Sequence, residues 1–317
     1  MRLRRAAAVG AGAAGGGALY LLERAAASRW RAGPAELVAA GLSLPSDIRH
    51  HFVATSDGGR VHVVERGTGP TAVLVHGVML GVATWARQLH TLPGRVIAVS
   101  QRGHGQSRAG AEGFSFERLA ADLAEVLEVL DVRDASLVGH SMGGMVAQLL
   151  ALRDPALSRR VRDLVLVATT PGPVVPSPLS PLSGLLGTAT ARALVGAERS
   201  GHGPLPKPAT IWAARVAFGT SPSRPDVELL RQMIDAMSPR ALAALIPHLL
   251  AFDVRSRLGA LSLPVHVVAG SRDVLTPPRT ARAIVERVPG ARLTLLPGCG
   301  HMVMLERADA LAALLTR

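Results

Sequence analysis

The sequence predicts an α/β fold with a mostly parallel central sheet, helices on both faces of the sheet and a helical cap inserted between two strands. Two observations lead to this class. Beyond residue 50, short continuous apolar runs alternate with segments whose apolar residues recur at helical spacing, and such runs are typical of strands covered on both faces. The alternation stops between Pro171 and Pro247, where helical patterns remain without a convincing strand.

The expected core elements follow one another in a regular order. Residues 50–55 and 60–66 are predicted to form a hairpin, because the Ser-Asp-Gly-Gly segment between them holds residues that accept positive φ angles. Ser115 can cap a helix that begins at Phe116, and Pro155 is expected to end a second helix. The further predicted strands are 71–75, 96–99, 136–138, 164–168, 265–269 and 293–296, and the predicted core helices are 116–130, 142–152 and 303–315.

These elements divide the chain into four predicted parts. Residues 1–49 form an N-terminal arm, 50–170 the first part of the core, 171–247 the helical cap and 248–317 the second part of the core. Because ligands bind at the carboxyl edge of a parallel sheet, a helical insertion there is expected to cover the binding site. The apolar cap side chains expected to select substrates are Leu182, Leu185, Leu186, Ile211, Trp212 and Phe218.

The composition argues against a nucleic-acid partner. The formal net charge is +12, but Lys207 is the only lysine, and the arginines are spread through the chain without clustering. Aromatic residues make up 3% of the chain, too few for a surface on which bases could stack. Cys299 is the only cysteine, which excludes an internal disulfide and a cysteine-rich metal site.

The N-terminus resembles a membrane anchor or an export signal. Three arginines within the first five residues precede an uncharged run at 6–22, and three alanines follow at 25–27. The run is shorter than the roughly 20 residues of a typical membrane span. Glu23 and Arg24 favour an uncleaved anchor over a cleaved signal. A membrane-associated or exported protein is therefore expected, and a cytoplasmic protein with an unstructured tail is the alternative.

Residues 139–143 (Gly-His-Ser-Met-Gly) match the nucleophile elbow, in which a serine sits on a sharp turn between a strand and a helix. Small residues two positions before and after the serine avoid clashes in that turn. The N-terminus of the following helix stabilises negative charge that develops nearby. The predicted strand 136–138 and helix 142–152 supply this context, so Ser141 is the candidate nucleophile.

Residues 53–317 resemble the α/β-hydrolase fold family, in agreement with the α/β class predicted above. The resemblance rests on four motifs that occur in the family's chain order. The four motifs are His76-Gly77, residues 100–107 (Ser-Gln-Arg-Gly-His-Gly-Gln-Ser), the elbow followed by Gly144, and Gly270-Ser271-Arg272-Asp273 together with Gly298-Cys299-Gly300-His301. The second motif departs from the family at Ser100, because the family usually has an acidic residue before the Arg-Gly-x-Gly-x-Ser run.

The resemblance implies a catalytic triad of Ser141, His301 and Asp273. His301 follows the last predicted strand, where the family's general base lies, and Asp273 follows the strand at 265–269. The carboxylate would hold the imidazole tautomer and stabilise the imidazolium that forms when serine attacks. Asp253, which precedes that strand, remains the alternative acid.

Two backbone N–H groups are expected to form the oxyanion hole. Met142 follows the nucleophile directly, and Val78 follows the His76-Gly77 pair. The ring of His76 is expected only to brace its loop. Trp85 has two interpretations, as a wall of the substrate pocket or as a packed core residue.

The implied function is hydrolysis of carboxylic esters, small or lipid-like, through an acyl-serine intermediate, without a metal or an organic cofactor. The serine excludes haloalkane dehalogenase and epoxide hydrolase chemistry, because members of the fold with those activities use an aspartate at the elbow. Three alternatives stay open. They are carbon–carbon bond hydrolysis or cofactor-free perhydrolysis, acyl transfer to an alcohol or amine, and a non-catalytic binding protein on the same fold, against which the complete triad argues.

Overall fold

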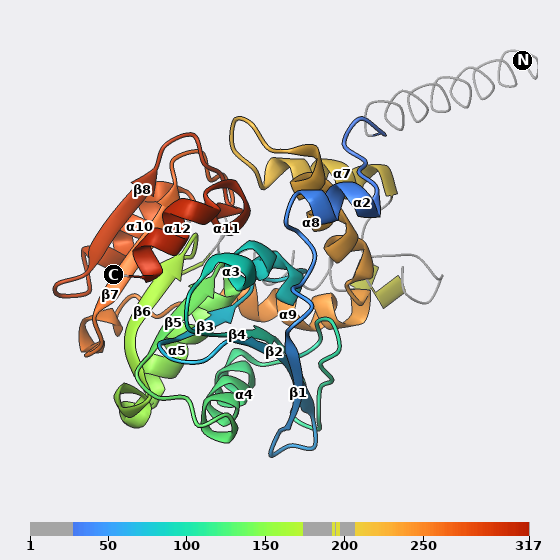
Figure 1. The fold of residues 1–317 in the computed structure, drawn as a ribbon. Coiled ribbons are helices and arrows are strands. Elements are labelled where there is room, and N and C mark those ends of the chain that lie inside the picture. The colour runs from blue at the N-terminus through green and yellow to red at the C-terminus, as the bar shows by residue number, and fades with distance from the viewer. Residues whose placement is uncertain (1–27, 174–191, 194, 197–206, 317) are drawn as a thin grey trace, which may run out of the picture.

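The computed structural model describes residues 28–173, 192–193, 195–196 and 207–316. Its strands form an eight-stranded sheet with the order β1-β2-β4-β3-β5-β6-β7-β8 (Figure 1). β2 pairs antiparallel with both β1 and β4, and all other pairs are parallel, which confirms the predicted α/β class. The strands are β1 (Arg49–Ala54), β2 (Arg60–Arg66), β3 (Thr71–Val75), β4 (Arg95–Ser100), β5 (Ala135–His140), β6 (Val161–Val167), β7 (Val265–Gly270) and β8 (Arg292–Leu296).

The predicted hairpin is formed by β1 and β2. Gly58 in its turn has a φ of 82°, a conformation that glycine adopts without steric cost. The Asp57 carboxylate accepts hydrogen bonds from Thr55 Oγ1 at 2.7 Å and from Gly59 N at 3.2 Å, which stabilises the turn.

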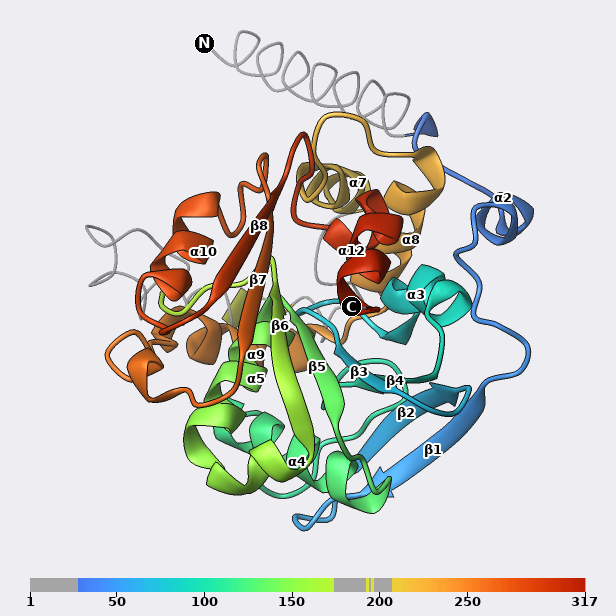
Figure 2. The same cartoon turned by 60° about the vertical axis from the view of Figure 1, so that its left-hand side comes forward.

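Helices cover both faces of the sheet (Figure 2). On one face, apolar residues of the strands pack against α4, α5 and α10. On the other face they pack against α3, α11 and α12. The bounds of these helices are α3 (Ala86–Thr91), α4 (Phe116–Val129), α5 (Met142–Arg153), α10 (Pro278–Val285), α11 (Val303–Glu306) and α12 (Ala308–Leu315), and short 3₁₀ helices lie at Val82–Trp85, Pro155–Arg159 and Leu258–Ala260.

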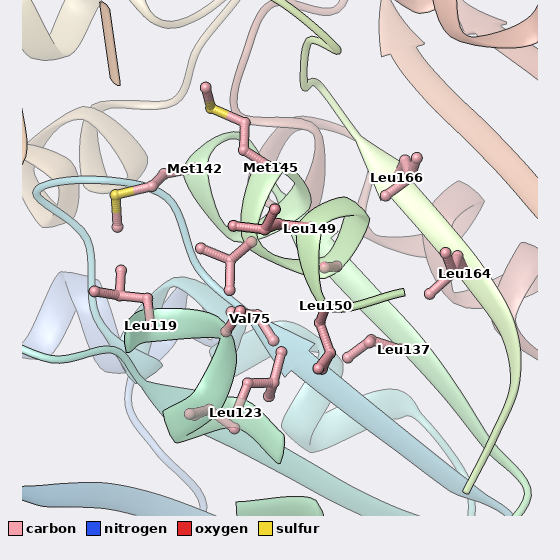
Figure 3. Packing of buried hydrophobic residues seen from close by; sticks show 14 of the residues in the cluster. Val75, Leu119, Leu123, Leu137, Met142, Met145, Leu149, Leu150, Leu164 and Leu166 are labelled. Carbon is pink, nitrogen blue, oxygen red and sulfur yellow. The ribbon is translucent and has the colours of Figure 1, made fainter. Parts of the chain in front are cut away.

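The apolar runs of the sequence form the interior between the sheet and the helices that cover it. Figure 3 shows side chains from α4 and α5 meeting those of the strands, among them Leu123, Leu149 and Leu137. Each fully buried side chain of this kind stabilises the fold by about 1.5–3 kcal/mol. Ser115 caps α4 by accepting a hydrogen bond from Arg118 N at 3.1 Å, as its sequence position predicts. This packing holds the carboxyl ends of the central strands in fixed positions.

The chain between β6 and β7 contributes the helices α7 (Lys207–Val216), α8 (Arg224–Ala236) and α9 (Pro239–Ala251). Ser223 and Ser238 cap α8 and α9, respectively. α9 continues past residue 247, so the predicted boundary between cap and core falls inside this helix. Much of the predicted cap, including Leu182, Leu185 and Leu186, lies outside the described residues.

The described part of the N-terminal arm runs along the cap. Helix α2 (Pro34–Ala39) lies beside α8 in Figure 1. Arg31 forms an ion pair with Glu228 of α8 at 3.8 Å, and the Arg29 guanidinium lies 5.9 Å from the centre of the Trp212 ring on α7. The arm therefore joins the cap before the chain enters the core.

The predicted helix at 303–315 is wrong in its continuity, because it breaks into α11 and α12 at Arg307. Arg307 has φ −137° and ψ 46°, outside the helical region. The break coincides with contacts to other segments. The Arg307 guanidinium donates to the Pro297 carbonyl at 3.1 Å, and Glu306 accepts hydrogen bonds from Gly219 and Gly300. Helical periodicity in the sequence does not encode such contacts.

Candidate active site

Four loops bring the candidate residues to one edge of the sheet. Gly77, Ser141, Asp273 and His301 follow β3, β5, β7 and β8, respectively. Because these strands are parallel, their carboxyl ends lie at the same edge, where α/β folds place their ligand sites. Residues that are up to 224 positions apart in the sequence (77 to 301) therefore meet in space.

Ser141 occupies a strained turn between β5 and α5. Its φ is 52° and its ψ is −118°, a conformation that costs a non-glycine residue roughly 1–3 kcal/mol. A Cβ atom on Gly143 would lie 2.3 Å from the Val75 carbonyl oxygen, and one on Gly139 would lie 2.6 Å from the Gly143 oxygen. The two glycines of the elbow are therefore required by the close approach of the backbone, as the motif predicts.

His301 and Asp273 form a buried pair, with 2.8 Å between His301 Nδ1 and Asp273 Oδ2. Asp273 Oδ1 also accepts from Leu275 N and Thr276 N, and Oδ2 accepts from Thr276 Oγ1. Burial opposes ionisation of Asp273, but attraction to His301 and these hydrogen bonds outweigh it, so the pKa of the carboxyl lies below its ordinary value. An ionised Asp273 holds the proton of His301 on Nδ1 and leaves Nε2 as the basic nitrogen.

Asp253 takes no part in this pair. Its side chain is 39% exposed and forms an ion pair with Arg255, with 2.9 Å between Arg255 Nε and Asp253 Oδ1. The structure thus brings together His301 and Asp273, and it keeps the alternative acid at the surface.

Ser141 and His301 line one cavity of about 560 Å³. No hydrogen bond joins the Ser141 hydroxyl to His301 in the part of the chain that the structure describes, and catalytic hydrogen bonds often tighten only when substrate binds. Apart from Ser141, Thr170, Thr276 and the rings of His140 and His301, the lining is apolar, and it contains no carboxylate, lysine or arginine among the described residues. The apolar lining from the cap includes Trp212, Val216, Leu230, Ile234, Ile246 and Leu249.

The backbone beside Ser141 offers two N–H groups without an acceptor among the described residues. Met142 is the first residue of α5, where N–H groups have no intrahelical acceptor. Val78 lines the cavity. The next N–H along, that of Met79, is taken, because it donates to His104 Nε2 at 3.1 Å. Gly77 allows this loop to approach the elbow, since a Cβ atom there would lie 3.0 Å from both His140 Nδ1 and Ser141 Cβ.

Two buried neutral histidines hold the Val78 loop. His76 Nε2 accepts from Gln101 N at 3.0 Å, and its Nδ1 donates to the Gly77 carbonyl at 2.7 Å. Burial lowers the pKa of His76 to about 3 and that of His104 to about 4. The ring of His76 thus braces its loop, as the sequence suggested.

In the loop at residues 100–107, where the family usually has an acidic residue at position 100, carboxylates from other elements bind Arg102. The Arg102 guanidinium forms paired hydrogen bonds with Asp57 from the β1–β2 turn and with Asp122 from α4, at 2.7–2.9 Å. Ser100 itself donates to the His104 carbonyl at 2.9 Å. Carboxylates from two other elements therefore hold this loop.

The structure corrects the interpretation of Trp85 as a wall of the pocket. Trp85 is fully buried and packs in the apolar cluster with Leu89 and Leu74, and it does not line the cavity that contains Ser141. Trp212 of the cap lines the cavity instead. A packed interior excludes Trp85 from the site because its ring fills space between the sheet and α3.

Sequence reasoning missed Thr276 and His140. Thr276 Oγ1 lies 2.7 Å from Asp273 Oδ2 and 3.2 Å from His301 Nδ1. His140 Nε2 donates to the His301 carbonyl at 3.0 Å, and its ring lines the cavity. A threonine three residues after the acid was the only signal for the first of these contacts.

The described residues contain no group of three or more His, Cys, Asp or Glu side chains that could hold a metal ion.

Comparisons with known proteins show which family this chain is similar to. A model of the alpha/beta hydrolase family matches residues 72–314. An uncharacterized protein of Mycobacterium tuberculosis is 32% identical over 250 residues, which cover 74% of this chain and 71% of that protein. A pimeloyl-(acyl-carrier protein) methyl ester esterase of Nitrosospira multiformis is 29% identical, covering 81% of this chain and 97% of its own.

A solved structure gives the same result. The thermophilic esterase from Thermogutta terrifontis superposes with a TM-score of 0.72 at 26% identity, covering 84% of this chain and 97% of that chain. The family match, the strand order and the elbow are consistent with one another. The chain belongs to the alpha/beta hydrolase family.

Proposed function

We propose that this protein is a serine hydrolase that cleaves carboxylic esters through an acyl-serine intermediate. The observation that carries the proposal is the Asp273–His301 pair, which opens into the same cavity as the strained Ser141. The esterases among the similar proteins support the same reaction class.

The reaction follows from the roles of these groups. Ser141 Oγ attacks the ester carbonyl carbon while His301 Nε2 takes its proton, and Asp273 stabilises the resulting imidazolium. The N–H groups of Val78 and Met142 stabilise the oxyanion of the tetrahedral intermediate. When the intermediate collapses, His301 returns the proton to the departing alcohol. Water then attacks the acyl-serine, again with His301 as base, and releases the acid and free Ser141.

We also propose that the substrate carries an uncharged, apolar acyl chain. The described cavity walls hold no carboxylate, lysine or arginine that could pair with a charged substrate group. Burying an unpaired charge in such a cavity would be costly, whereas each buried methylene contributes about 0.8 kcal/mol. Small and lipid-like esters both satisfy this description.

Ser141→Ala should abolish ester hydrolysis and leave the fold intact. Loss of the nucleophile should lower kcat by roughly 10⁴–10⁶. The measurement is turnover of p-nitrophenyl esters by purified wild type and variant, with labelling by a fluorophosphonate probe as a second readout. A variant that hydrolyses these esters within tenfold of wild type would refute the assignment. If the probe labels the wild-type protein but the wild type hydrolyses no ester, acyl transfer or carbon–carbon bond hydrolysis would be favoured.

We further propose that residues 1–27 place the enzyme at a membrane or export it. The support is the basic and apolar pattern of this segment, which lies outside the described residues. Within the described residues, the structure has no helix that is both long and apolar enough to cross a membrane. Truncation at Ser28 should leave turnover of a soluble ester unchanged and move the protein to the cytosolic fraction. Full-length protein found wholly in the cytosol would refute this location.

A further inference from the structure

The cap and the loop that carries His301 share a junction of main-chain contacts. The chain leaves α7 through residues 217–220 and runs against residues 298–301. His301 N donates to the Ala217 carbonyl at 2.7 Å, and Thr220 N donates to the Gly298 carbonyl at 3.1 Å. The backbone of the candidate base is thus bonded directly to the end of a cap helix.

Two glycines make this junction closer than other residues would allow. A Cβ atom on Gly219 would lie 2.1 Å from the Gly298 carbonyl oxygen, and one on Gly300 would lie 2.4 Å from Gly219 N. Both distances are shorter than Cβ contacts in real proteins, and the obstructing atoms are backbone. The cap and the His301 loop therefore contact each other backbone to backbone, with no room for a side chain between them.

The carboxylate of Glu306 closes the junction from the side of the core. Its Oε2 accepts from Gly219 N at 2.8 Å, and its Oε1 accepts from Gly300 N at 2.9 Å. One oxygen thus serves the cap segment and the other serves the His301 loop. A hydrogen bond to an ionised acceptor is about twice as strong as a neutral one. Only a carboxylate offers two such acceptors, because an amide would present an NH₂ group to one of the two N–H donors.

The groups around Glu306 affect its ionisation in opposite directions. Burial raises the pKa of Glu306 above its ordinary value, although both backbone N–H groups and the neighbouring Arg307 favour the ionised form. Cys299 lies beside it, and burial raises the pKa of this thiol to about 12, so the thiol is neutral. Burying the ionised carboxylate therefore costs free energy, and the hydrogen bonds from Gly219 N and Gly300 N offset part of that cost.

We propose that Glu306 is a positioning residue that couples the cap to His301, so that the cap helix α7 and the base loop open and close together. Glu306 would then transmit the position of the cap to His301 through main-chain hydrogen bonds, without itself touching the substrate. The kinetic consequence rests on the proposed esterase function, but the structural coupling does not.

Hydrogen exchange measured by mass spectrometry on the full chain tests the coupling without a substrate. Glu306→Gln should speed exchange about tenfold or more in two separate segments, residues 207–220 and 296–302, because one change opens both. The matched control is Asp309→Asn, which removes a carboxylate charge three residues away at an exposed site on α12. Faster exchange in only one of the two segments, or the same exchange in both variants, would overturn the proposal.

A kinetic readout separates positioning from general loss of structure. Glu306→Gln should lower kcat on p-nitrophenyl acetate and also alter the kcat/KM ratio between long and short acyl chains, whereas Asp309→Asn should change neither. If Glu306→Gln does not fold, Glu306→Asp, which keeps the charge but is too short to bridge both N–H groups, carries the same comparison. Absence of ester turnover in wild type would count against the proposed function alone, since the exchange result would still stand.

Discussion

At the scale of single residues, the candidate base His301 differs from three neighbouring histidines whose rings hold the backbone. His301 is paired with a carboxylate, and the rings of His76, His104 and His140 hydrogen-bond to backbone groups. Burial lowers the pKa of each of these three rings, so they remain neutral near pH 7. Of these four histidines, His301 is the one paired with a carboxylate that would stabilise its protonated form during a reaction.

Asp273→Asn should impair ester hydrolysis far more than Asp253→Asn. Asparagine at 273 would favour the wrong imidazole tautomer, and the expected loss in kcat is on the order of 10⁴. Asp253 contacts Arg255 at the surface, so its variant serves as the control and should stay close to wild type. The two variants are compared by kcat on one p-nitrophenyl ester. The reverse ranking would transfer the acid role to Asp253.

At the scale of elements, the cap is held from two sides. The arm packs on it from outside, where Arg29 and Arg215 lie over the ring of Trp30 at 5.6 and 5.5 Å. The His301 loop bonds to it from inside through Ala217. Trp212 on α7 lies between the two, since it faces Arg29 and also lines the cavity. One side chain, Trp212, therefore contacts the arm and also forms part of the cavity wall.

Trp212→Ala should shift the preference of the enzyme toward longer acyl chains. Removing the ring opens space along an apolar wall, and each further buried methylene would raise kcat/KM by about fourfold, the equivalent of about 0.8 kcal/mol. The measurement is kcat/KM across p-nitrophenyl esters from acetate to dodecanoate. Val38→Ala on the exposed side of α2 is the control. An unchanged profile in a folded Trp212→Ala variant would mean that this wall does not contact the acyl chain.

At the scale of the whole molecule, buried histidines make the fold sensitive to acid. Burial lowers the pKa of His62 to about 4, that of His76 to about 3 and that of His104 to about 4. In the unfolded chain these rings take up protons below about pH 6.5, whereas in the folded protein they stay neutral to about pH 4. Their contribution to stability is thus present above pH 6.5 and is lost as the pH falls.

The free energy of unfolding should therefore fall steeply between pH 6.5 and pH 4. Three protons bound only by the unfolded chain correspond to a slope of up to about 4 kcal/mol per pH unit. Burial also lowers the pKa of a fourth histidine, His140, which acts in the same direction. Glu306, whose pKa is raised, acts in the opposite direction, but it is one group against four. Urea unfolding followed by tryptophan fluorescence at pH 7, 6 and 5 measures the slope. Equal urea midpoints at pH 7 and pH 5 would contradict the expectation.

Local features of the chain were predictable from the sequence. The strands, the hairpin turn and the elbow depend on residues that are neighbours in the chain, such as Gly58 in its turn or Gly139 and Gly143 around Ser141. The pairing of Asp273 with His301 was implied by the resemblance to the α/β-hydrolase family, with Asp253 as the alternative acid. The roles of Val78 and Met142 in the oxyanion hole stay predictions; Val78 lines the cavity, and Met142 is the first residue of α5.

By itself, therefore, the sequence determined the α/β class and the loops that carry the candidate site, because periodicity and turn chemistry act over a few residues. Only the tertiary structure decided which large side chain reaches the cavity. Trp85 and Trp212 are equally apolar, but the sheet and α3 enclose the first, and the cap turns the second toward Ser141. The tertiary structure also revealed the contacts of Glu306, whose partner Gly219 is 87 residues away in the sequence. Contacts over such separations depend on how whole elements pack, which no local pattern encodes.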